Sequence, residues 1–362
     1  MPIVRSFLHG TTNILYFNRK YEWILKPNAI KRMCYGYHAC NQKTQTLPQS
    51  GPWNVLFFGT DDFAVESLRS LYSKYRCNVL HRLEVVTGNK GKENAVSKYA
   101  KQNGLVINTW PIQNKVTNFH IGVVVSFGHL IPSHVIDSFP LGMINVHGSL
   151  LPRWRGAAPI IYSLMNGDQE TGITLMKIMP KKFDIGAIVA QKKVDIGPHE
   201  TMPELYIKLA KLGADVLAET MENLQQALIT TKPQIEENVT YAPKITSKIS
   251  LIRWNEMSAK NVYDLQRALS GLYPLTTKFK DKTIKLFDIC EIEKPTNAGK
   301  FEDEAPGVVS FDKQSNVLAV KCKNGTWISV KRIIVSGRPP MNARDFCNGF
   351  LSGKHKARIH FC

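Results

Sequence analysis

An asparagine and a histidine two residues apart end a short apolar segment in the stretch INVHGSLLPRWRGAAPIIYSLMNG, residues 144–167. Residues i and i+2 of a strand point to the same face, which places Asn145 and His147 about 6–7 Å apart. An amide can hold a carbonyl oxygen and an imidazole can move one proton, so the pair suits acyl transfer to an amine. A structural core histidine is the other interpretation, and the tripeptide NVH alone favours it.

The sequence around this pair offers no nucleophile of its own. Ser149 is close, but it lacks the G-x-S-x-G turn that exposes a catalytic serine, and no cysteine lies nearby. A nucleophile would therefore come from the substrate. The chain also lacks G-x-G-x-x-G after its first strand and lacks G-x-x-x-x-G-K-[ST] altogether, so a dinucleotide site and a P-loop are poorly supported.

Alternating strands and helices are expected to position the pair. Val55–Phe58 is an apolar run typical of a buried strand, and the following helix can be capped by Thr60, Asp61 or Asp62. Further strands are expected in RLEVVTG, IGVVVSFG and GMINVHG, with a helix in ENAVSKYAKQNG. This order predicts an α/β fold with a doubly wound, mostly parallel, Rossmann-like sheet. Ligands of such sheets bind beyond the carboxyl ends of the strands, which is where the Asn–His pair falls.

The pattern changes towards the C-terminus. Two strands joined by a loop around Pro180–Gly186 and a long helix complete the first domain, and a polar, prolyl linker follows. One helix and the short runs KTIKLFDIC, GVVSFD, NVLAVKC and GTWISVKRIIV then predict a small OB-like β-barrel. We expect an N-terminal extension, a catalytic domain, a linker and a barrel at residues 1–52, 53–229, 230–246 and 247–362.

The formal net charge of +18 is unevenly distributed. Residues 1–50 carry seven Lys/Arg against one acidic residue, and residues 241–362 carry 21 against 11, while the middle is nearly neutral. A basic appendage on a neutral body indicates a polyanionic partner. The first fifty residues lack the apolar core of a secretory signal and fit a mitochondrial presequence, with a disordered basic tail as the alternative. No apolar run reaches the roughly 18 residues of a membrane span. The scattered cysteines indicate reduced thiols in an intracellular compartment, with a metal site at Cys34, His38 and Cys40 as the minor alternative.

Longer stretches carry a family resemblance. NVHGSLLPRWRGAAPI and GDQETGITLMKIMPKKFDIG resemble the methionyl-tRNA formyltransferases, and the likeness runs from VLFFGTDDFA through YAPKI and IRW into the C-terminal region. N-x-H followed by S-L-L-P is specific to enzymes that use 10-formyltetrahydrofolate, and PRWRGAAPI narrows the resemblance towards the tRNA enzyme. It implies formyl transfer to the α-amine of methionyl-tRNA, in the mitochondrial matrix if the leader is a presequence. We expect a monomer without a metal.

The resemblance also implies roles for individual residues. Asn145, His147 and Asp184 match the catalytic asparagine, histidine and aspartate of the family, and Asp184 would orient the imidazole and favour its charged form. The folate-lining segment of the family matches Ser149, Leu150, Leu151 and Pro152. Arg153 and Arg155 either bind phosphate or the folate tail, or tie down the bend. The second aspartate of the family loop is replaced here by Ala187, which leaves the geometry of that loop open.

Candidate tRNA contacts lie in two regions. The basic insertion of bacterial relatives is shortened to TGNKGKENAVSKY, where only Lys90 and Lys92 match; they would grip the acceptor stem or belong to a solvated loop. The tail from residue 331 is the densest basic region. Its candidates for phosphate contacts are Lys331, Arg332, Arg338, Lys354 and Lys356, with a merely solvated basic surface as the alternative.

Two other functions stay open at this point. A formyltransferase for a small amine, such as glycinamide ribonucleotide or an amino sugar, shares N-x-H and S-L-L-P, but the purine enzyme would not need a basic barrel. A catalytically inactive RNA-binding protein on the same fold is the second alternative. The intact set of Asn145, His147 and Asp184 argues against it.

Overall fold

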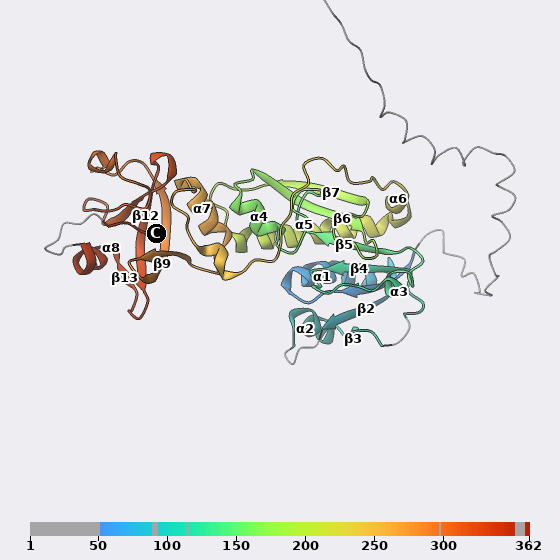
Figure 1. The fold of residues 1–362 in the computed structure, drawn as a ribbon. Coiled ribbons are helices and arrows are strands. Elements are labelled where there is room, and N and C mark those ends of the chain that lie inside the picture. Colours follow the sequence, from blue (N-terminus) through green and yellow to red (C-terminus); the bar gives the residue numbers. More distant parts are fainter. Residues whose placement is uncertain (1–50, 89–92, 114–115, 297, 352–358) are drawn as a thin grey trace, which may run out of the picture. The chain divides into compact units, whose positions relative to one another are not determined.

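The computed structural model describes residues 51–88, 93–113, 116–296, 298–351 and 359–362 (Figure 1). The expected presequence therefore lies outside the described residues, apart from its last two positions. So do Lys90, Lys92, Lys354 and Lys356, and the roles expected for them stay predictions. In the described part of the chain, no helix is both long and apolar enough to cross a membrane.

The first domain is built on a seven-stranded sheet, and its strands run β3-β2-β1-β4-β5-β6-β7 (Figure 1). Strands β1 to β5 are parallel, whereas β6 is antiparallel to β5 and β7 to β6. The expected doubly wound, mostly parallel sheet is therefore confirmed. The strands span Trp53–Phe58, Leu80–Gly88, Val106–Trp110, Ile121–Val125, Met143–His147, Glu170–Lys177 and Ile188–Asp195, from β1 to β7.

Helices cover both faces of this sheet. Val55 and Phe57 of β1 belong to the core that contains Leu68 of α1, whereas Leu56 and Phe58 belong to a second core on the opposite face. A sheet buried on both sides requires the continuous apolar strands seen in the sequence. The helices are α1 (Asp62–Arg76), α2 (Ala95–Gln102), α3 (Ser133–Ile136), α4 (Pro159–Met165), α5 (Met202–Glu222) and α6 (Leu224–Ile229).

Polar caps explain where the two longest helices begin. The Asp61 carboxylate accepts the backbone N–H of Ala64 at 3.1 Å, so Asp61 is the cap among the three expected candidates. Thr201 and Glu204 form a capping box at the start of α5. Helices α1 and α5 pack against each other.

The strand order reverses between β1 and β4, and this switch point determines where a ligand can bind. Loops that leave β1 and β4 turn to opposite faces of the sheet there, which opens a crevice at the carboxyl ends of the strands. Strand β5 lies next to β4 and ends at His147. The fold thus carries the end of β5 to the crevice.

The C-terminal domain holds a six-stranded antiparallel sheet in the order β10-β11-β12-β9-β8, with β13 paired to β12. Strand β8 was not among the four expected runs. The strands span Leu275–Phe279, Lys282–Ile292, Val309–Asp312, Val317–Lys321, Trp327–Val335 and Met341–Asn342, from β8 to β13. The helices are α7 (Ala259–Ala268) and α8 (Ala343–Phe346), with short turns at Ser247–Ser250, Ala298–Phe301, Lys323–Gly325 and Cys347–Leu351.

The last four residues of the chain join the two edges of this sheet. On the β10 side, Phe361 donates its N–H to the carbonyl of Gly307 at 2.8 Å. On the β8 side, Lys278 and Cys362 exchange two backbone hydrogen bonds of 2.8 and 2.9 Å. Residues 359–362 therefore lie between β10 and β8 and close the sheet into the expected small barrel.

Candidate active site

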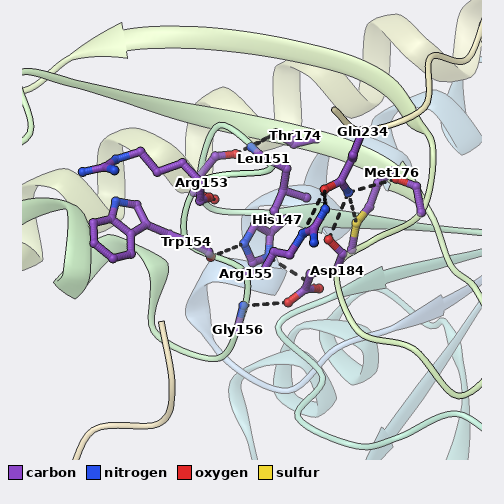
Figure 2. A network of polar contacts seen from close by, with 12 residues as sticks. His147, Leu151, Arg153, Trp154, Arg155, Gly156, Thr174, Met176, Asp184 and Gln234 are labelled. Carbon is purple, nitrogen blue, oxygen red and sulfur yellow. Dashed lines mark hydrogen bonds and ion pairs between the residues drawn. The ribbon is translucent and has the colours of Figure 1, made fainter. Parts of the chain in front are cut away.

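His147 is held at the end of β5 by a contact to the main chain. Its side chain is 6% exposed, and its Nε2 lies 3.0 Å from the carbonyl oxygen of Trp154 (Figure 2). A carbonyl oxygen can only accept, so Nε2 carries the hydrogen. Nδ1 is the other ring nitrogen, and it lies 3.8 Å from Oδ1 of Asp184. In the neutral ring Nδ1 is therefore the proton acceptor.

Asp184 approaches this nitrogen from the loop between β6 and β7. Its Oδ2 accepts the backbone N–H of Gly156 at 2.8 Å, and its own carbonyl oxygen accepts the side-chain amide of Gln234 at 2.9 Å (Figure 2). The backbone of Asp184 is in the left-handed region, with φ of 54°. These contacts fix the carboxylate, so that Oδ1 faces His147.

Asn145 lies two residues before His147 on β5, and both line the same cavity. Within the part of the chain that the structure describes, the Asn145 side chain has no hydrogen-bond partner. Its donors and acceptor are therefore available to a bound molecule. The three residues that the sequence singled out for catalysis thus meet at one cavity wall, because Asp184 lines it as well.

The cavity has a volume of about 1040 Å³. Single-ligand pockets have roughly 300–1,000 Å³, so this one has room for parts of two reactants. It lies at the switch point of the sheet, where the loop after β1 contributes Thr60 and Asp61 and the loop after β4 contributes residues 126–131. Residues 156–161, 176–179, 182–184, 202, 206, 244–245 and 272–273 complete most of the remaining wall.

The expected folate-contacting residues Ser149, Leu150, Leu151 and Pro152 do not line this cavity. They form a bend that is bonded to β6. Ser149 donates its hydroxyl to the carbonyl of Arg153 at 2.7 Å, and the backbone N–H of Leu151 donates to the Thr174 hydroxyl at 3.1 Å. The cavity wall is made instead by the segment Ser126–Ile131, which the sequence reasoning did not select. A folate contact of the 149–152 segment stays a prediction.

Arg153 and Arg155 both have partners inside the protein. Arg153 makes a bidentate pair with Asp168 and lies over the Trp154 ring at 4.4 Å, and hydrogen bonding to Asp168 raises the pKa of Arg153. Arg155 is buried and donates twice to Oε1 of Gln234, at 2.8 and 3.1 Å. Of the two interpretations, these contacts favour a structural role for both arginines.

The half-buried carboxylate of Asp61 also lines the cavity. Burial raises the pKa of Asp61, against hydrogen bonds from Ser126 and Ala64 that lower it. Burial also raises the pKa of Tyr206, and the nearby Asp61 charge raises it further. Tyr206 accepts the backbone N–H of Phe63 at 2.9 Å. The sequence pointed to Asp61 only as a helix cap, and it gave no signal for Tyr206.

Among the described residues, no group of three or more His, Cys, Asp or Glu side chains is arranged to hold a metal ion.

The barrel carries exposed cations on neighbouring strands. Strand register pairs Lys278 of β8 with Thr283, Lys285 of β9 with both Thr276 and Ile334, and Arg332 of β12 with Phe287. Lys278, Lys285 and Arg332 are exposed while their neighbours Phe279, Leu286 and Ile333 are buried, so the three cations share the outer side. We call these three residues the β8–β9–β12 face.

Of the expected tRNA contacts that the structure describes, only Arg332 belongs to this face. It pairs with Asp288 at 3.3 Å and lies 5.1 Å over the Phe287 ring. Lys331 and Arg338 are also exposed, and Arg338 lies over Phe350. Lys278 and Lys285 were not among the expected contacts, because a search for dense charge along the chain does not detect cations brought together by strand pairing.

Comparisons with known proteins agree on the family. The formyl transferase family profile matches residues 88–221, and the formyl transferase C-terminal domain profile matches residues 244–351. The mitochondrial methionyl-tRNA formyltransferase of Rattus norvegicus is 38% identical, over 92% of this chain and 88% of that protein. The corresponding Homo sapiens protein is 40% identical, over 87% and 82%. The methionyl-tRNA formyltransferase of Nitratidesulfovibrio vulgaris is 33% identical, over 84% and 96%.

Solved structures agree on the fold. The sugar 3N-formyl transferase WlaRD, whose structure was determined with dTDP and 5-N-formyl-THF, superposes with a TM-score of 0.56 at 18% identity, covering 80% of this chain and all of that one. The N-formyltransferase from Helicobacter canadensis, in complex with folinic acid and dTDP-3-aminofucose, gives 0.58 at 15% identity, covering 77% and 98%.

Identity decides between the tRNA enzyme and a small-amine enzyme. The sugar enzymes share the fold at below 20% identity, whereas the methionyl-tRNA enzymes share up to 40% of residues over most of the chain. Both family profiles are matched, including the C-terminal one. The chain therefore belongs to the methionyl-tRNA formyltransferase family, of the mitochondrial type.

Proposed function

We propose that this methionyl-tRNA formyltransferase takes its formyl group from 10-formyltetrahydrofolate and carries out the transfer at Asn145, His147 and Asp184, in the mitochondrial matrix. The observation that carries the proposal is the arrangement around His147. The Trp154 carbonyl engages Nε2, Nδ1 faces Asp184, and Asn145 has an unengaged amide on the same wall. One wall thus offers a base, its counter-ion and a hydrogen-bond donor.

Each of the three residues has a separate role in this proposal. The Asn145 amide donates to the formyl oxygen, which gains negative charge when the amine nitrogen bonds to the formyl carbon. His147 accepts at Nδ1 the proton that the amine loses, and Asp184 stabilises the resulting imidazolium. As the bond between the formyl carbon and the folate nitrogen breaks, His147 returns the proton to that nitrogen. Atoms and charges balance without a protein nucleophile.

The donor is proposed to bind beside the loop after β4. Phe127 and Ile131 are buried there, and Leu130 is 57% exposed at the cavity. Apolar side chains next to a few polar groups suit a flat heteroaromatic ring. Folates of this class are present in two of the solved formyltransferase structures, as 5-N-formyl-THF in one and folinic acid in the other. Ser149–Pro152 would then support the catalytic wall from behind.

The acceptor tRNA is proposed to lie along the β8–β9–β12 face, with Lys331 and Arg338 as further phosphate contacts. Cations on one exposed face can contact several phosphates of a nucleic-acid backbone at once, which scattered cations cannot. Such phosphate contacts supply most of the affinity of a protein for a nucleic acid. Lys90, Lys92, Lys354 and Lys356 stay predictions. The same holds for the division into catalytic domain, linker and barrel at residues 53–229, 230–246 and 247–362, and for a monomeric enzyme.

One assay tests the activity and its donor. The full chain is incubated with labelled 10-formyltetrahydrofolate and with charged or uncharged methionine tRNA. Label is expected only on the charged tRNA, as formylmethionine. Equal transfer to glycinamide ribonucleotide or an amino sugar would favour the small-amine alternative. Specific tRNA binding without any transfer would favour the inactive RNA-binding alternative.

The compartment is tested separately. Residues 1–52 fused to a fluorescent protein are expected to direct it into mitochondria, because their cations lack acidic counterparts and a secretory apolar core. A fusion that stays in the cytosol would contradict the matrix assignment.

A further inference from the structure

The Gln234 side chain joins two parts of the catalytic wall. Gln234 lies in the segment 230–246, which falls largely between the two family matches. Its Nε2 donates to the carbonyl oxygens of Asp184 and Gly186, both at 2.9 Å, and its Oε1 accepts two hydrogen bonds from Arg155 (Figure 2). Nε2 also lies 3.9 Å from the Met176 sulfur. A primary amide has two N–H donors and two acceptor lone pairs, so the two carbonyls and Arg155 already use its full hydrogen-bonding capacity.

On one side, the amide holds the loop that carries Asp184. The backbone of Asp184 has a positive φ, a conformation that costs free energy in any residue other than glycine. Such a conformation persists only where the surrounding contacts hold the backbone in place. The loop also runs against β6: a Cβ on Gly186 would lie 1.6 Å from the carbonyl oxygen of Lys177. The two carbonyls bonded to Gln234 flank this close approach.

On the other side, the amide holds the side chain of Arg155. The residues before and after Arg155 supply the main-chain groups that contact His147 and Asp184. The preceding Trp154 contributes the carbonyl to His147, and the following Gly156 contributes the N–H to Asp184. Besides its two hydrogen bonds to Gln234, the Arg155 guanidinium has one ion-pair partner within the described residues, the exposed Glu236 at 3.4 Å. Gln234 is therefore its main fixed contact.

We propose that Gln234 is a positioning residue for formyl transfer. Its amide holds the Asp184 loop and Arg155 at the separation at which the Asp184 carboxylate faces Nδ1 of His147. The inference rests on the proposed function. Gln234 does not line the cavity, so it acts through Asp184 rather than on a reactant.

Two substitutions separate the hydrogen bonds of Gln234 from its size. Gln234→Glu keeps an acceptor for Arg155 but replaces two donors with an oxygen that repels the two loop carbonyls. Gln234→Met has similar length and no amide. We expect each to lower kcat roughly 10- to 100-fold, the loss typical of removing a residue that orients a functional group. KM for either substrate should change by less than about twofold, because Gln234 does not line the cavity and the substitutions remove no contact with a bound substrate.

The measurements are kcat and KM for both substrates across pH, with turnover counted per folate-binding site titrated with 5-formyltetrahydrofolate. The pH profile of kcat should shift in both variants, because Asp184 no longer faces His147 at a fixed distance. Gln226→Glu is the matched control: it makes the same charge change at an exposed position on α6 and should leave kcat and the profile unchanged.

A double substitution tests the route of the effect. If Gln234 acts through Asp184, Gln234→Met combined with Asp184→Asn should be no slower than Asp184→Asn alone. Additive losses would overturn the proposal. So would Gln234 variants that lose thermal stability but keep wild-type kcat and pH profile per folate-binding site. Failure of the wild-type chain to formylate methionyl-tRNA would instead contradict the proposed function.

Discussion

The main-chain carbonyl oxygen of Trp154 lies 3.0 Å from Nε2 of His147, and this contact selects the tautomer of the neutral His147 ring. Trp154 is itself in the left-handed region, with φ of 63°. Its N–H donates to the Thr240 hydroxyl at 2.8 Å and its indole N–H to Asp168 at 2.7 Å. Thr240 and Asp168, which lie far apart in the sequence, thus hold Trp154 so that its carbonyl oxygen points to His147.

Replacing the indole should loosen this anchor. Trp154→Phe keeps a ring beneath Arg153 but removes the N–H that donates to Asp168. We expect a loss of about 1.5–3 kcal/mol in the free energy of unfolding, the usual contribution of a hydrogen bond to a charged group. Denaturant unfolding at neutral pH measures it. An unchanged midpoint would show that Arg153 alone keeps Asp168 in place.

Asn145 and His147 should be essential for turnover. Asn145→Ala removes the proposed donor to the formyl oxygen, and His147→Ala removes the proposed base. Loss of such a group typically lowers kcat ~100- to 1000-fold, and we expect at least this for each variant. Folate affinity, measured by titration, should stay near wild type. Comparable turnover in either variant would refute its catalytic assignment.

Asp184→Asn tests the charge next to His147. The amide keeps the shape of the side chain, and its oxygen can still accept the Gly156 N–H. It cannot stabilise an imidazolium 3.8 Å away, so kcat should fall severely while both KM values change little. Single-turnover formylation measures the chemical step directly. Full activity would mean that this loop only shapes the pocket.

Asp61→Asn should change the pH dependence of stability. Burial raises the pKa of Asp61 above its usual 3.8. The stability contribution of such a group is fully present below pH 3.8 and is lost as pH rises through the raised value. Asparagine cannot ionise and still caps α1, so the variant should gain stability relative to wild type between acid and neutral pH. Thermal unfolding across that range measures the difference, and a constant difference would contradict the prediction.

Cations of the β8–β9–β12 face should contribute to tRNA binding through phosphates. Lys285→Ala should reduce the slope of log affinity against log salt concentration by roughly 0.7–0.9, with little dependence on tRNA sequence. Arg332→Ala should have a smaller effect because Asp288 already neutralises part of its charge. Lys211→Ala on α5 is the control, since Lys211 is also exposed and has no ion-pair partner in the described part of the chain. Equal slopes in all three variants would exclude this face.

Local patterns in the sequence determined most of the first domain and half of its site. Continuous apolar runs identify strands buried on both faces, as at Val55–Phe58, because burial removes the polar alternation. The two-residue repeat of a strand places Asn145 and His147 on one face without any tertiary information. Edge strand β3 was missed, because its exposed residues lack that apolar run.

Only the tertiary structure decided which distant groups meet at the cavity. The approach of Asp184 to His147 was expected from family resemblance, but its geometry depends on contacts from Gly156 and Gln234. No local pattern could place an amide from a polar, aperiodic segment between two loops. No local pattern shows that residues 359–362 close the barrel, or that cations from separate strands meet on its outer side. Periodicity reports which face a residue takes within one element, whereas pairing between elements depends on long-range packing that leaves no local pattern in the sequence.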